Sequence, residues 1–152
     1  MRRAVRTLLI FELGAWAGFA AAAAFVKRAF PSRGDEESDE VALVAVFDGI
    51  DLKSRAKAFR GGSMLSWFGG IAVDLRDVEL APGARLSVNT LFGGIAIRTP
   101  SSWRIESTTK VIFGGVDAAS PADVAPDAPV LTLEGTAFFG GVAVNADAGR
   151  PD

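Results

Sequence analysis

Apolar residues alternate with small or polar residues after each of five similar phrases in this chain. The first phrase reads Phe47-Asp48-Gly49-Ile50, and the later copies read Phe-Gly-Gly-Ile or Phe-Gly-Gly-Val from residues 68, 92, 113 and 139. The third and fifth positions after each Phe are apolar in every copy, with Asp or Ala between them. This period-two alternation predicts a β-strand with one buried face in every copy.

The copies recur every 21 to 26 residues. Such a period is typical of a solenoid, in which each repeat buries its apolar face on the next. We therefore predict an all-β fold, a single-stranded right-handed β-helix of about five coils over residues 41–147. A β-sandwich of hairpins is the alternative, because two-residue glycine turns also suit hairpins.

The repeated phrase is interpreted as a structural corner. Gly reaches positive φ without steric cost, so the glycine pair is expected to turn the chain, and Asp48 is tolerated in the same conformation. Stacking of the coils would align the Phe rings in a ladder. The residues of this predicted structural repeat are Phe47, Gly49, Phe68, Gly69, Gly70, Phe92, Gly93, Gly94, Phe113, Gly114, Gly115, Phe139, Gly140 and Gly141.

Further apolar runs predict two more strands in a coil, which would give the solenoid three faces. Val78–Leu80 and Leu86–Val88 flank the turn signal Pro82-Gly83. Trp103–Ile105 and Leu131–Leu133 have matching places in the later coils.

An apolar segment from Thr7 to Val26 precedes the repeats and carries Glu12 as its only charge. At about 1.5 Å per residue it matches the thickness of a bilayer core, so residues 1–28 are predicted to be a transmembrane anchor. A cleaved signal peptide and a buried soluble helix are the alternatives. Equal numbers of Lys and Arg flank the segment, so the positive-inside rule leaves the side of the membrane open.

Gly14 and Gly18 lie four residues apart in this segment, a spacing that lets two helices approach closely and makes them candidates for a helix–helix contact. Residues 29–40, rich in Asp and Glu, are predicted to be a flexible linker, and residues 148–152 a disordered tail. The acidic linker and the polar tail would then blunt the two ends of the solenoid against end-to-end stacking.

The composition argues against several classes of function. The chain has no Cys, His or Tyr and a net charge of −2. These features exclude a thiolate metal site and a Ser-His-Asp triad, and they argue against nucleic-acid binding. We therefore expect no enzyme activity, no cofactor and no metal site. A basic cluster of Lys53, Arg55, Lys57 and Arg60 is interpreted as a solvated face, with contact to anionic headgroups as the alternative.

The five phrases in register, with Pro82-Gly83, Pro100 and Trp103 in the intervening turns, resemble the carboxy-terminal domain of LiaF-like cell-wall-active antibiotic response proteins, a toastrack-type β-helix. The resemblance covers roughly Val44 to Val144. It implies a non-enzymatic role in bacterial envelope-stress signalling, in which the protein restrains a membrane sensor kinase. The single predicted membrane segment differs from the several that LiaF-like proteins usually have.

Two functions follow as hypotheses. The first is a single-pass regulatory or sensory module of the cell membrane, which contacts the bilayer and binds a protein such as a sensor kinase. The second is a scaffold that self-assembles at the membrane, through the transmembrane helix or through the ends of the solenoid. Neither hypothesis specifies the ligand or the binding face.

Overall fold

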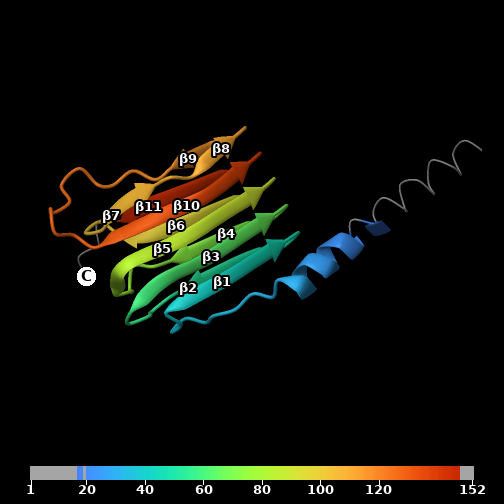
Figure 1. The fold of residues 1–152 in the computed structure, drawn as a ribbon, viewed down its shortest axis with the longest axis horizontal. Coiled ribbons are helices and arrows are strands. Elements are labelled where there is room, and N and C mark those ends of the chain that lie inside the picture. Colours follow the sequence, from blue (N-terminus) through green and yellow to red (C-terminus); the bar gives the residue numbers. More distant parts are fainter. Residues whose placement is uncertain (1–16, 19, 148–152) are drawn as a thin grey trace, which may run out of the picture.

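The structure is a computed structural model that describes residues 17–18 and 20–147. Its strands form two sheets of parallel neighbours, which stack into a β-solenoid of about four turns (Figure 1). One sheet contains β1 (Glu40–Val46), β3 (Phe59–Trp67), β5 (Leu80–Leu91), β7 (Arg104–Ser107), β8 (Lys110–Ile112) and β10 (Val130–Phe138). The other contains β2 (Gly49–Lys53), β4 (Gly70–Asp74), β6 (Gly94–Pro100), β9 (Gly115–Asp117) and β11 (Gly141–Asp147).

The solenoid has two faces, and the prediction of three strands per coil is wrong. Leu80 and Leu86–Val88 belong to the single long strand β5, which runs through Pro82-Gly83. The register between β3 and β5 shifts at this point, and Gly83 takes φ +73°. The turn signal therefore marks a bulge inside a strand.

Each layer of the solenoid is one repeat, with strands in both sheets. The layers are not stacked in the order of the chain. The strands of one sheet lie in the order β1-β3-β5-β10-β7, with β8 also paired to β10, and those of the other lie in the order β2-β4-β6-β11-β9. The fifth repeat therefore lies between the third and the fourth. Figure 1 shows β10 and β11 beneath β8 and β9. The predicted count of about five coils in sequence order is corrected accordingly.

The predicted alignment of the apolar columns is confirmed. Ile71 pairs in register with Ile50 and Ile95, and Val142 pairs with Ile95 and Val116. These side chains and the inward residues of the other sheet form one core between the two sheets. The core excludes water along the whole stack, which makes it the main source of stability.

The corner between the sheets also stacks as predicted, but the Phe residues turn the chain. Each Phe has a φ of 49–56°, in the left-handed region, and none of the paired glycines of the phrases is among the residues with positive φ. The assignment of positive φ to the glycine pair is therefore wrong. The left-handed conformation costs a non-glycine residue about 1–2 kcal/mol, and the stacked rings offset this at about 0.5–1.5 kcal/mol per pair.

The first glycine of each pair is required by the close approach of the next layer. A Cβ on Gly69 would lie 2.3 Å from the carbonyl oxygen of Asp48, and one on Gly93 would lie 2.4 Å from that of Gly69. Asp48 itself belongs to the first layer, below which the described residues place no further strand. A side chain is tolerated there because, in the described part of the chain, the first layer has no preceding layer whose carbonyl a Cβ would meet.

A short helix covers residues 17–18 and 20–29. Within the described part of the chain, no helix has both the length and the apolar character needed to cross a membrane. Half of the predicted span, residues 7–16, lies outside the described residues, as do Gly14 and the predicted tail 148–152. Gly18 is described, and a Cβ placed on it would meet nothing within 4 Å.

The segment between the helix and β1, predicted as a linker, lies against the first layer. Arg33 and Ala42 exchange two backbone hydrogen bonds in an antiparallel bridge, at 2.6 and 2.7 Å. The Ser32 hydroxyl accepts a hydrogen bond from the backbone N–H of Val44 at 2.9 Å. The segment thus covers part of the outer edge of β1.

Candidate functional site

Five aromatic rings form a continuous ridge along the corner where the strands of the first sheet end. Neighbouring rings are parallel, with centroids 4.9–5.0 Å apart and interplanar angles of 1–11°. The side chains remain 36–72% exposed. We call this feature the aromatic ridge, and its members in spatial order are Phe47, Phe68, Phe92, Phe139 and Phe113.

The corner is held by hydrogen bonds that the sequence analysis missed. The Ser66 hydroxyl donates to the carbonyl of Gly69, and the Thr90 hydroxyl donates to the carbonyl of Gly93, each at 2.8 Å. Both side chains are buried and lie two residues before a ridge Phe. A Ser or Thr at this place, three residues before a Gly carbonyl, is the sequence signal that could have found these bonds.

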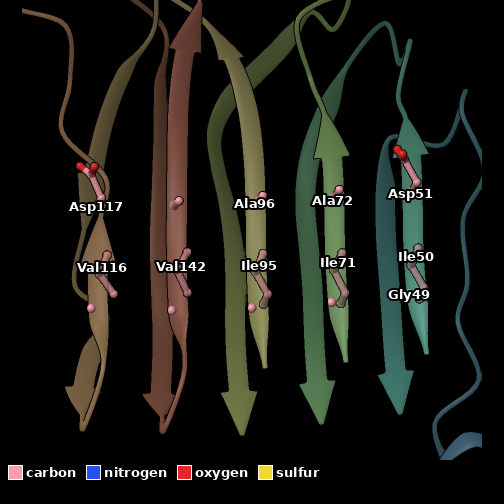
Figure 2. A pocket seen from close by; sticks show the side chains of 15 residues that line it. Gly49, Ile50, Asp51, Ile71, Ala72, Ile95, Ala96, Val116, Asp117 and Val142 are labelled. Atoms are coloured by element: carbon pink, nitrogen blue, oxygen red, sulfur yellow. The ribbon is translucent and has the colours of Figure 1, made fainter. Parts of the chain in front are cut away.

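Beside the ridge, the outer face of the second sheet is a shallow groove of about 890 Å³, shown in Figure 2. Its surface carries few side chains, because the outward positions in each strand are a Gly and then an Ala or an Asp. We call it the glycine–alanine strip, formed by Gly49, Gly70, Gly94, Gly141 and Gly115 together with Ala72, Ala96 and Ala143.

The titratable groups of this groove are at its two ends. Asp51 lies in the first layer and Asp117 in the last, and the three Ala residues lie between them (Figure 2). Four strand spacings of about 4.8 Å separate the two carboxylates. That separation is far above the 5–9.5 Å at which two carboxylates act together as acid and base or nucleophile. The groove is therefore suited to apolar contact.

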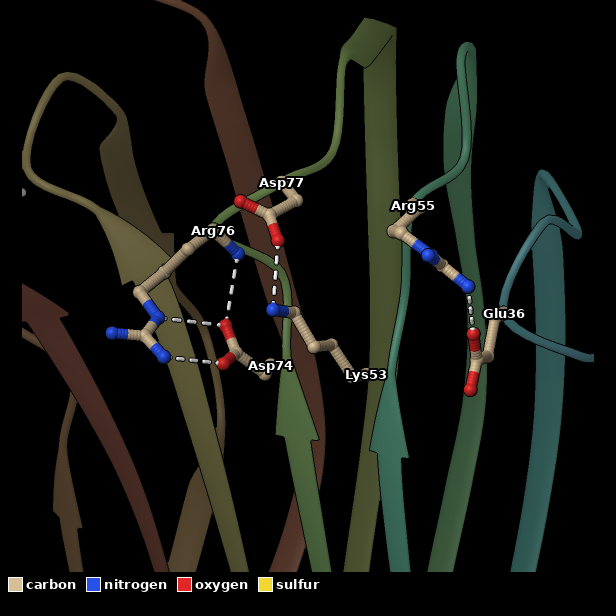
Figure 3. Close-up of polar contacts among 6 residues, drawn as sticks. All are labelled: Glu36, Lys53, Arg55, Asp74, Arg76 and Asp77. Carbon is tan, nitrogen blue, oxygen red and sulfur yellow. Dashed lines mark hydrogen bonds and ion pairs between the residues drawn. The ribbon is translucent and has the colours of Figure 1, made fainter.

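The predicted basic cluster lies at the opposite corner, which we call the far edge. Three of its members pair with acidic residues there: Lys53 with Asp77 at 2.9 Å, Arg55 with Glu36, and Lys57 with Glu79 at 3.8 Å. Figure 3 shows the first two of these pairs. The interpretation as a solvated face agrees with these exposed pairs, because neutralised cations attract anionic headgroups weakly.

Three carboxylates of the described residues have a lowered pKa, and that of Asp35 is lowered chiefly by a hydrogen bond from the Ser38 hydroxyl. The pKa of Asp74 lies below its ordinary value chiefly because the Arg76 side chain donates hydrogen bonds to it, at 2.9 and 2.6 Å (Figure 3). The pKa of Asp48 is lowered by a hydrogen bond from the Lys27 ammonium at 2.9 Å. The Lys27–Asp48 contact ties the helix to the corner beside Phe47, the first ring of the ridge.

At the last layer, among the described residues, no strand pairs with the outer edges of β8 and β9. We call these two strands the open edge. Val111 and Ile112 are exposed there, next to Phe113, the most exposed ring of the ridge. The neighbouring β7 is partly covered, because the Ser120 hydroxyl bonds both the N–H and the carbonyl of Ile105.

The tail was predicted to blunt the fifth coil at the end of the solenoid, and this placement of the fifth coil is wrong. The final strand, β11, lies in an interior layer between β6 and β9. The layer at this end of the described solenoid is therefore the fourth repeat.

The described residues contain no group of three or more acidic side chains placed to hold a metal ion. Comparison of the chain with protein-family models, with curated proteins and with solved structures finds no match.

Proposed function

We propose that the chain is a membrane-anchored, non-enzymatic regulatory or sensory module that binds another protein through its solenoid. The supporting observation is the pairing of the aromatic ridge with the glycine–alanine strip, which gives one side of the molecule a continuous apolar surface. Large exposed apolar patches on a folded domain mark interaction sites. The wide separation of Asp51 and Asp117 supports binding over catalysis on this surface.

The proposed anchor is the apolar segment from Thr7 to Val26, which is long enough to cross a bilayer once in the cell membrane. Its carboxy-terminal part is the helix that the Lys27–Asp48 contact ties to the first layer. In this arrangement the apolar side of the solenoid lies near the membrane, within reach of the membrane-proximal part of a partner. The resemblance to LiaF-like proteins favours a sensor kinase of the bacterial envelope-stress response.

Site-directed photocrosslinking of the full chain in its native membrane tests this proposal. A photoreactive amino acid at Ala96, on the glycine–alanine strip, is compared with one at Lys57, on the far edge. We expect a membrane sensor kinase to be captured from Ala96 and not from Lys57. Equal capture from both positions, or capture of the kinase from neither, contradicts the proposal.

The second candidate, a self-assembling scaffold, is favoured by the open edge alone. Unpaired strand edges with exposed apolar side chains can pair with another chain. The segment before β1 covers part of the edge at the opposite end of the solenoid, which favours assembly of two copies through the open edge over a continuous filament. Capture of only the chain itself by a photoreactive amino acid at Ile112, on the open edge, would select this candidate.

A further inference from the structure

We infer that the aromatic ridge lies against the surface of a lipid bilayer, so that the solenoid rests on the membrane with its far edge in water. The inference rests on the proposed membrane anchoring and extends it to the folded domain. In this inference the aromatic ridge contacts lipid, and the glycine–alanine strip is the surface that binds the protein partner.

Exposed apolar side chains gather on one side of the molecule. The large exposed apolar residues of the described part of the chain are all on the helix and its end, on the aromatic ridge, or on the open edge that adjoins it. With about 200 Å² for each aromatic side chain, the exposed part of the ridge is on the order of 500 Å². That is close to the largest apolar patch found on an ordinary soluble monomer, about 300–600 Å².

The ridge faces the same way as the helix. The strands of the first sheet run toward the corner that carries the ridge, and Figure 1 shows their arrowheads pointing to the side where the helix lies. The Lys27–Asp48 pair, at 2.9 Å, holds the end of the helix beside Phe47. An anchor that continues the helix into a membrane therefore brings the ridge to the same membrane.

Charge is distributed in the same sense, because three of the basic residues at the far edge are paired with acidic residues there. Arg28 is exposed on the helix and Lys110 on β8, which ends at the ridge, whereas Lys27 is paired with Asp48. The acidic residues of segment 35–39 lie at the far edge, where the Arg55 backbone N–H donates to Glu36 and that of Arg60 donates to Asp39. Cations beside apolar rings suit a surface of anionic headgroups, and aromatic side chains favour the membrane interface.

A depth measurement on the full chain tests the inference. The chain has no native cysteine, so Ile112→Cys places one fluorophore beside the ridge in the layer farthest from the helix. Lys57→Cys places a control fluorophore at the far edge. The labelled proteins are reconstituted into phosphatidylcholine–phosphatidylglycerol vesicles that contain nitroxide lipids. We expect severalfold stronger quenching at position 112 than at position 57.

Variants of the ridge supply the second arm. Phe92→Asn and Phe139→Asn remove apolar surface, and Asn tolerates the left-handed conformation that these positions require. Phe92→Leu and Phe139→Leu keep the apolar surface and serve as controls. We expect the Asn pair to abolish most of the quenching at position 112 and the Leu pair to retain it. Circular dichroism checks that both pairs remain folded.

The outcomes separate this inference from the proposed anchoring. Protein that floats with vesicles and resists alkaline carbonate, but is not quenched at position 112, overturns the ridge contact and leaves the anchor standing. Quenched protein that carbonate releases supports the ridge and contradicts the anchor. Protein that does not float overturns both. A label shielded from aqueous iodide but not quenched by lipid means that protein covers the ridge, which also overturns the inference.

Discussion

The two glycines of each corner have different surroundings, although the sequence repeats them as a pair. The backbone N–H of Gly94 donates to the carbonyl of Gly69 at 3.1 Å, so this hydrogen bond brings the next layer over that carbonyl. A Cβ on Gly93 would lie 2.4 Å from the same oxygen, whereas one on Gly94 would meet its nearest atom at 3.9 Å. Only the first glycine is therefore fixed by the stacking of layers.

Gly93→Ala is expected to destabilise the protein by about 3 kcal/mol, because the clash is with backbone that cannot move without breaking the ladder. Gly94→Ala is the matched control and is expected to change stability by less than about 0.5 kcal/mol. Urea unfolding followed by circular dichroism measures both. Equal destabilisation by the two substitutions would show that close approach does not distinguish the positions.

The Asp74–Arg76 pair predicts a loss of stability in acid. The pKa of Asp74 in the folded protein is lowered from 3.8, so the unfolded state takes up its proton at a higher pH. The contribution is fully present above pH 3.8 and is lost as the pH falls through the lower folded-state pKa. Arg76→Gln is expected to cost about 1 kcal/mol at pH 7, and the difference from the parent protein shrinks below pH 3.8.

Lys57→Gln is the control for this titration, because its ammonium lies 3.8 Å from Glu79 and both side chains are exposed. We expect this substitution to leave the dependence of unfolding free energy on pH unchanged. A difference between the Arg76→Gln variant and the parent that stays constant into acid would contradict the role given to Asp74.

At this scale the sequence predicted the stacked rings but assigned the left-handed conformation to the wrong residue. Conformational propensity favours Gly at positive φ. It does not include the stacking energy that a Phe ring gains from the two parallel rings beside it. The first glycine was correctly predicted to be a corner residue. The structural reason is its short distance to a carbonyl of the neighbouring layer, which the sequence does not show.

Among the elements, the order of the layers is the feature that departs most from the sequence. Each repeat has the same period-two pattern, so any of them could pair with any other in the same register. Buried side chains distinguish them in the structure: Leu131 and Leu133 of β10 are fully buried, whereas the residues of β8 are exposed. The fifth repeat occupies an interior layer because its apolar residues gain two neighbours there.

One signal for this order was present in the sequence. The outward position two residues after the second glycine of each phrase is Asp51 in the first layer and Asp117 in the last, and Ala in the three interior layers. A charged side chain is tolerated more easily where only one strand flanks it. In sequence order the second Asp falls in an interior coil, so the pattern becomes visible only in the order of the layers.

Cysteine pairs across the glycine–alanine strip test the order of the layers. Ala96→Cys with Ala143→Cys joins adjacent strands and is expected to form a disulfide on mild oxidation. Ala96→Cys with Asp117→Cys spans two strand spacings, about 10 Å, beyond the reach of a disulfide. Mass spectrometry under non-reducing conditions distinguishes the two. A disulfide between positions 96 and 117 in the monomer would restore the sequential order.

For the molecule as a whole, the interior position of the fifth repeat predicts the effect of shortening the chain. Ending the chain after Asp117 removes the layer on which β7, β8 and β9 pack. We expect the first three layers to persist and residues 104–117 to become open to proteases. Limited proteolysis with mass spectrometry measures this, and the parent protein is the control. Resistance of residues 104–117 in the shortened chain would contradict the observed stacking.

The general architecture was predictable because it depends on local pattern. The all-β solenoid, the aligned apolar columns and the aromatic stack follow from spacing within each repeat. The two-faced cross-section could not be predicted, because the sequence Pro82-Gly83 is compatible with a bulge inside a strand and with a turn between two strands. The polarity of the molecule, with apolar rings at one edge and ion pairs at the other, emerges only when the coils are stacked.

The intercalated layer also bears on how the chain acquires its structure during synthesis. The first three repeats can stack on one another as they leave the ribosome, since each finds its neighbour already made. The fourth then lacks its native neighbour until the fifth has been translated. Completion of the solenoid is therefore a single late event in which two repeats dock together, and a ribosome that stalls between them would expose unpaired strands to chaperones and proteases.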